Sequence, residues 1–166
     1  METGKPEIIS EDKQIERLLS NAFGGPPLIF RVSHNTRKYE ISTLVVPGRP
    51  EPELCSLATI GLWRTPLTGP NATETSRLEL TSLFEVSREG AREVLAAAAF
   101  KIMRTHKFVS AGTVFMNCLH DWYPKSTVPH IYFVDANFWS FPNLQPIRMG
   151  ALHILSLIHI SEPTRL

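Results

Sequence analysis

Four short β-type segments between residues 28 and 84 constrain the fold of this chain more than any other feature. Runs of β-branched, aromatic and other apolar residues alternate there with turns, which predicts strands at residues 28–33, 38–46, 54–63 and 77–84. The polar residues 34–37 join the first two strands into a predicted hairpin. The proline-rich run 47–52 ends the second strand, because proline cannot continue a hydrogen-bonded ladder.

Two details of the later strands bear on the fold. Gly61 marks a bulge or a close approach of two backbones near the end of the third predicted strand. The fourth strand alternates Leu78 and Leu80 with Arg77, Glu79 and Thr81, a pattern typical of a half-buried strand whose polar side chains face water.

Two helices are predicted around these strands. Ser10 can cap a first helix whose apolar stripe is formed by Ile15, Leu18, Leu19 and Ala22, and the run 24–27 of glycines and prolines ends it. Ser87 can cap a longer second helix that continues to about His106. Four successive alanines, 96–99, would let this second helix lie close to a sheet.

Further strands are predicted at residues 112–115 and 130–135, with a single helical turn at 117–123 between them. The element order predicts an α+β fold in which a mixed, mostly antiparallel sheet is flanked by helices. At 166 residues with 43 % hydrophobic and 20 % charged residues, the chain has the composition of one globular domain. Residues 1–27 are expected to form an N-terminal helix and turn, and residues 28–154 the domain itself.

The region 111–139 and the residues just after it are dense in aromatic side chains next to turns. Large aromatic residues in such positions can anchor a protein interface, because they bury a large area at a small cost in conformational entropy. The candidate interaction surface consists of Trp122, Tyr123, Phe138, Trp139 and Phe141. A corner of the hydrophobic core explains the same residues equally well.

The sequence offers little support for catalysis or for a cofactor. The net charge is +1, which gives no electrostatic case for binding nucleic acid or an anionic membrane. Common catalytic and metal-binding motifs do not occur, and the two cysteines have no zinc-site spacing, so they are expected to be buried thiols. The alternative is a small hydrolase or metal-dependent enzyme that uses His120, Asp121 or His130. No cofactor is expected.

Residues 29–147 resemble the suppressor of fused (SUFU) domain family, in its bacterial single-domain form. The resemblance is carried by the ordered segments SLATIGL, RLEL, GTVF, WYPKS and HIYFV followed by FW. It implies a non-enzymatic domain that acts by binding another protein, most specifically a bacterial immunity protein that neutralises a cognate polymorphic toxin. The animal relative binds a transcription factor through a chain with an additional C-terminal domain, so that partner is not carried over.

The two ends of the chain give separate expectations. The polar residues 1–14 lack the apolar segment of a signal peptide, and no apolar run is long enough to span a membrane, so the cytoplasm is expected. Residues 155–165, LSLIHISEPTR, match the translation of a transposase-based sequencing adapter. Residues 155–166 are therefore interpreted as a non-native tail on a C-terminally truncated domain. Loss of a final strand would leave an edge of the sheet unpaired.

Overall fold

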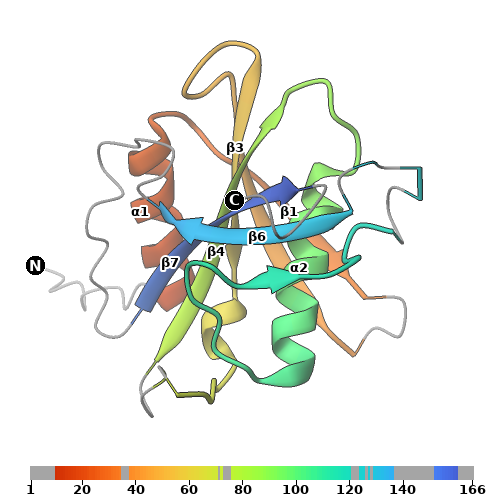
Figure 1. The fold of residues 1–166 in the computed structure, drawn as a ribbon. Coiled ribbons are helices and arrows are strands. Elements are labelled where there is room, and N and C mark those ends of the chain that lie inside the picture. Colours follow the sequence, from red (N-terminus) through yellow and green to blue (C-terminus); the bar gives the residue numbers. More distant parts are fainter. Residues whose placement is uncertain are drawn as a thin grey trace, which may run out of the picture.

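A computed structural model describes residues 10–34, 38–70, 72, 76–120, 124, 125, 127 and 129–136, together with the backbone of residues 152–160. Its elements follow in the order α1 (Glu11–Phe23), β1 (Leu28–Ser33), β2 (Glu40–Pro47), β3 (Leu54–Ile60), the 3₁₀ helix η1 (Leu62–Arg64), β4 (Arg77–Glu85), α2 (Ala91–Thr105), β5 (Val114–Phe115), β6 (His130–Asp135) and β7 (Leu152–Ile160) (Figure 1). The strands form one sheet in the order β1-β2-β3-β4-β7-β6-β5. Among the described strand pairs only β4–β7 is parallel, which confirms the predicted α+β fold with a mixed, mostly antiparallel sheet.

The first helix begins and ends where the sequence predicts. The Ser10 side chain accepts a hydrogen bond from the backbone N–H of Lys13 at 3.4 Å, and Gly24 takes a left-handed conformation with φ of 80° at the other end. Left-handed backbone is readily adopted by glycine, so the chain can turn there without strain. Ile15, Leu19, Ala22 and Phe23 are the buried residues of this helix.

The second helix begins later than predicted. Gly90, with φ of 76°, is its N-cap residue and α2 starts at Ala91, so the prediction that Ser87 caps the helix is wrong. The backbone N–H of Arg88 instead donates to the carbonyl of Glu85, which places residues 85–88 in a turn after β4. The helix ends at Thr105, and His106 caps it, close to the predicted end.

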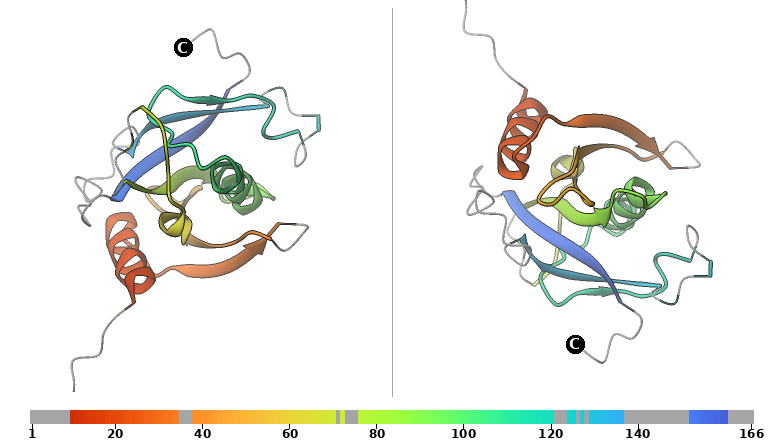
Figure 2. Two further views of the ribbon diagram at one scale, coloured as in Figure 1. Left: turned by 90° about the horizontal axis from the view of Figure 1, so that it is seen from below. Right: turned by 90° about the horizontal axis from the view of Figure 1, so that it is seen from above.

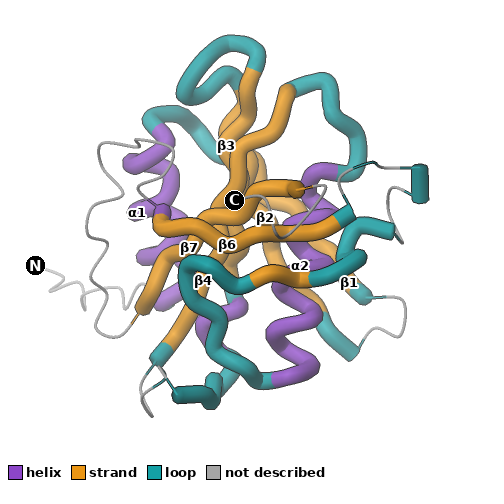
Figure 3. Tube along the Cα trace, viewed as in Figure 1, coloured by secondary structure: helices purple, strands orange, loops and turns teal. Residues whose placement is uncertain are grey.

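The two helices cover opposite faces of the sheet, and tube and ribbon views show the strongly twisted strands between them (Figures 2 and 3). Alternate residues of β2 and β3 divide between two cores because successive side chains of a strand point to opposite faces. The larger core contains Ile41 and Leu57 with the buried side of α2, including Ala96, Ala98 and Ala99, which confirms the expected close approach of this helix. The smaller core contains Leu44 and Ala58 with the buried residues of α1.

The third strand is shorter than predicted, and the fourth is more deeply buried. Strand β3 ends at Ile60, and Gly61 (φ 112°) turns the chain into η1. Strand β4 lies in the middle of the sheet and is buried on both faces, so the expectation that Glu79 faces water is wrong: its side chain is fully buried. The physical reason is that η1 folds back over β4 and covers this side chain.

The position between β4 and β6 is occupied by β7. This strand pairs in parallel with β4, from Arg77↔Leu152 to Ser82↔Leu157, and antiparallel with β6, from His130↔Ile160 to Asp135↔Leu155. Most of β7 falls in the segment interpreted as an adapter-derived tail. In the described part of the chain, β4 and β6 are therefore both paired on the side that faces β7. The interpretation of residues 155–166 as a non-native tail on a truncated domain stays a prediction.

Candidate interaction surface

The five aromatic residues chosen from the sequence, Trp122, Tyr123, Phe138, Trp139 and Phe141, all lie outside the described residues. Their proposed role as an interaction surface therefore stays a prediction. In the described turn that precedes them, residues 116–120, Met116 is half exposed and Leu119 is buried. Asn117 takes positive φ there (54°), so the residues preceding 121 form turns rather than the predicted regular helical turn.

The residues of the enzymatic alternative do not form a described catalytic group. His120 is exposed and Asp121 lies outside the described residues. His130 is buried, and its Nδ1 accepts a hydrogen bond of 2.9 Å from the backbone N–H of Asn117. This contact indicates a structural role for His130, because it connects the turn after β5 to the start of β6. Among the described residues, no three His, Cys, Asp or Glu side chains lie together as a metal ion would require.

The clearest exposed apolar surface is the edge strand β1, which sequence patterning did not single out. Leu28, Ile29 and Phe30 are 52 %, 42 % and 36 % exposed. Val32 packs against the core under α2, and the guanidinium of Arg92 from α2 lies 3.9 Å from the centre of the Phe30 ring. Strand alternation therefore puts Leu28 and Phe30 on the α2 face and Ile29 on the α1 face.

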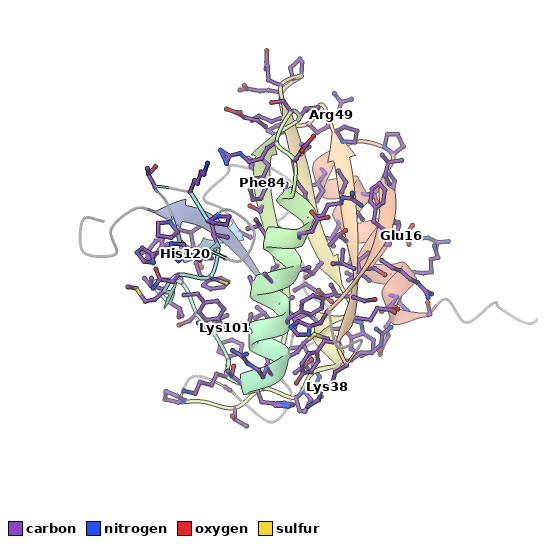
Figure 4. The ribbon with its side chains drawn as sticks, turned by 90° about the vertical axis from the view of Figure 1, so that its right-hand side faces the viewer. Glu16, Lys38, Arg49, Phe84, Lys101 and His120 are labelled. Atoms are coloured by element: carbon purple, nitrogen blue, oxygen red, sulfur yellow. The ribbon has the colours of Figure 1, made fainter. Side chains whose placement is uncertain are left out.

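Contacts at both ends of the β1–β2 hairpin fix the position of this strand. The rings of His34 and Tyr39 lie 5.7 and 6.4 Å from that of Phe100 on α2, and His34 N–H donates to the carbonyl of Tyr39 at 2.8 Å. At the other end, Arg49 Nε donates to the carbonyl of Gly24 at 3.0 Å, just before β1 begins. Figure 4 shows Lys38 and Arg49 near these opposite ends of the molecule.

A buried carboxyl group lies on the other side of the sheet, beneath η1. Glu79 Oε1 accepts hydrogen bonds from the backbone N–H groups of Gly61 (2.8 Å) and Trp63 (3.2 Å), and Oε2 accepts one from the Thr59 hydroxyl. The Thr59 hydroxyl in turn accepts from Leu80 N–H at 2.9 Å. These side chains satisfy backbone donors where β3 leaves β4 and the ladder stops at the Ala58↔Thr81 pair.

Burial raises the pKa of Glu79, the hydrogen bonds from Thr59, Gly61 and Trp63 lower it, and the charge of Asp12 raises it, so that the pKa lies at about 8. Shifted carboxyl groups mark catalytic sites when they face a cleft. Glu79 is instead fully buried and accepts hydrogen bonds from Thr59 in β3 and from the backbone N–H groups of Gly61 and Trp63 after it. Its geometry is that of a structural carboxyl group, and an alternating sequence pattern cannot distinguish such a residue from a solvent-facing glutamate.

The polar contacts continue from η1 to the first helix. Trp63 Nε1 donates to Asp12 Oδ1 at 2.8 Å, and Arg64 forms an ion pair with the same carboxylate. The start of α1 is thereby attached to the turn that Glu79 holds. No helix in the described part of the chain is long and apolar enough to cross a membrane.

Comparison with known proteins finds a relative by sequence and another by structure. No family model matches the sequence. The chain is 25 % identical over 132 residues to immunity protein YqcF of Bacillus subtilis strain 168, an alignment that covers 80 % of this chain and 69 % of that protein. It also superposes with a TM-score of 0.62 on the crystal structure of a suppressor of fused homologue from Neisseria gonorrhoeae FA 1090. That match covers 91 % of this chain and 78 % of the other, at 13 % identity. The chain therefore carries a domain of the suppressor of fused-like fold.

Proposed function

We propose that this chain is a non-enzymatic binding domain that acts in the cytoplasm as an immunity protein and neutralises a cognate polymorphic toxin. The similarity to immunity protein YqcF carries the proposal, since the alignment spans most of both chains. The suppressor of fused-like fold supports it, because the family resemblance implies action through protein binding. In this proposal the bound chain covers the active surface of the toxin and so neutralises it.

The described surface supplies features that such binding needs. Interfaces gain most of their free energy from a few side chains that become fully buried, and aromatic residues and arginine are common among them. Leu28, Ile29 and Phe30 are exposed on one edge of the sheet, with Arg92 against the Phe30 ring. The buried contacts of His130 and Glu79 favour structural roles for these two ionisable residues.

The test is co-expression with the toxin encoded beside this gene. A catalytically inactivated toxin should co-purify with the chain in a fixed stoichiometry, and the active toxin should lose its growth inhibition when the chain is present. A folded chain that neither binds nor protects against that toxin would contradict the proposal.

The enzymatic alternative is tested on the same preparation. One zinc ion bound per chain would favour it. So would a hydrolytic activity that His120→Ala removes without changing the thermal melting temperature.

A further inference from the structure

Among the described strands, β1 ends the sheet, and the hydrogen-bond pattern identifies which of its backbone groups point away from β2. The His34–Tyr39 pair is hydrogen-bonded. In an antiparallel ladder bonded and non-bonded pairs alternate, so Val32–Ile41, Phe30–Thr43 and Leu28–Val45 are the bonded pairs of β1 and β2. On the other side of β2, the N–H of Gly48 donates to the carbonyl of Leu54, so the bonded pairs of β2 and β3 alternate from there. This alternation also leaves Ile41, Thr43 and Val45 to bond with β1. Ile29, Arg31 and Ser33 therefore direct their N–H and C=O groups away from the sheet.

This edge lacks the usual protection against pairing with another chain. Edge strands are commonly very short, or carry lysine, proline or a bulge. Strand β5, at the opposite edge, has two residues, whereas β1 has six and pairs with β2 in unbroken register. Arg31 is the only charged residue within β1, and three successive apolar residues expose a third or more of their surface.

Cationic side chains border this apolar edge on both faces. Arg92 lies over Phe30 on the α2 face. The Arg31 side chain, on the α1 face, is 79 % exposed, with Glu40 Oε1 3.6 Å from its Nη1. Lys38 and Arg49 stand near the two ends of the hairpin. Glu40 offsets one of these charges, and the rest favour a partner that brings carboxylates.

We propose that an extended segment of the toxin adds to β1 as an eighth strand of the sheet, with apolar side chains against Leu28 and Phe30 and carboxylates near Arg31 and Arg92. The inference rests on the proposed immunity function and names the surface through which it is exercised. Strand addition of this kind takes affinity from main-chain hydrogen bonds and specificity from the alternating side chains.

Arg31 allows the backbone contribution to be separated from the side-chain contribution. Arg31→Pro removes an outward N–H donor but no donor of the β1–β2 ladder, because Arg31 is in a non-bonded pair. It should weaken binding of the inactivated toxin about tenfold or more. Arg31→Ala removes the same charge and leaves the backbone intact, so it should weaken binding less than about fivefold. Calorimetric titration of both variants measures the difference.

Hydrogen exchange on the unmodified chain tests the same pairing without a substitution. The amides of Ile29, Arg31 and Ser33 should exchange rapidly in the free chain and become protected in the toxin complex, whereas that of Phe30 is protected in both. Toxin binding with no protection at these three amides, or equal binding by the proline and alanine variants, would overturn the inference and leave the immunity function standing. Failure of the wild-type chain to bind the toxin would overturn both. A wild-type dimer that Arg31→Pro splits would assign the edge to a second copy instead.

Discussion

The α2 face and the α1 face of the sheet are stabilised by different kinds of contact. Under α2, leucines from β3 and β4 pack against Leu95 and a surface of buried alanines, and the fit depends on side-chain size. Under α1, the smaller apolar core is accompanied by Glu79, the one acidic residue among the buried described residues. Hydrogen bonds connect this carboxyl group to η1, and η1 connects to Asp12 on α1. The stability of the α2 face therefore depends on how well side-chain volumes fill the core. The stability of the α1 face depends on hydrogen bonds to buried polar groups.

The largest effect is expected for Glu79→Ala. The substitution leaves the N–H groups of Gly61 and Trp63 without their acceptor and opens a cavity, so it should lower the free energy of unfolding by about 4 kcal/mol. Glu79→Gln is the matched control, because its amide oxygen can still accept from both N–H groups, and should cost far less at pH 7. Urea unfolding followed by circular dichroism measures both. Equal losses in the two variants would mean that volume, and not hydrogen bonding, controls this face as well.

A smaller loss is expected on the α2 face. Leu95 is fully buried and apolar in its contacts, so Leu95→Ala should lower the free energy of unfolding by about 3 kcal/mol through lost burial and the residual cavity. Leu95→Met keeps most of the volume and should cost less than about 1.5 kcal/mol. If the α2 face depends on side-chain volume alone, the loss of unfolding free energy in Leu95→Ala should stay constant between pH 5 and pH 8. A loss that varied with pH would contradict this distinction between the two faces.

The α1 face should in contrast respond to pH. The pKa of Glu79 is about 8 in the folded chain and near 4.5 when exposed, so between these values the folded state binds a proton that the unfolded state does not. The contribution of Glu79 to the free energy of unfolding is then greatest below about pH 4.5. It falls as the pH rises toward 8, by at most about 1.4 kcal/mol per pH unit. The free energy of unfolding of wild type minus that of Glu79→Gln, measured across pH 5 to 8, isolates this contribution. A flat difference would show that Glu79 is charged throughout.

The two faces also differ in how far the sequence predicts them. The helix stripe of α1, the alanines of α2 and the hairpin at 28–46 follow from periodicity and turn residues, and the structure confirms them. Glu79 could not be placed, because its burial depends on η1 folding back over β4 and on β7 lying beside it, and both are contacts distant in sequence. The exposure of β1 depends likewise on strand order, which local patterning does not encode. The interpretation of residues 155–166 as a non-native tail rests on the match to a translated adapter sequence and stays a prediction; the backbone of residues 152–160 pairs with β4 and β6.

The smallest loss of stability is expected for substitutions in the contact between η1 and Asp12 of α1. Trp63→Phe keeps an aromatic ring but removes the Nε1–H that donates to Asp12, so it should lower the free energy of unfolding by about 1 kcal/mol. Arg64→Ala removes the ion pair to the same carboxylate. It should cost less, because the Arg64 side chain is 56 % exposed and water screens the pair. If hydrogen bonding to η1 holds α1 in place, amide exchange in α1 should accelerate more in Trp63→Phe than in Arg64→Ala, while exchange in α2 stays unchanged in both. Faster exchange in both helices would mean that the two faces unfold as one unit and that the distinction between them is one of chemistry alone.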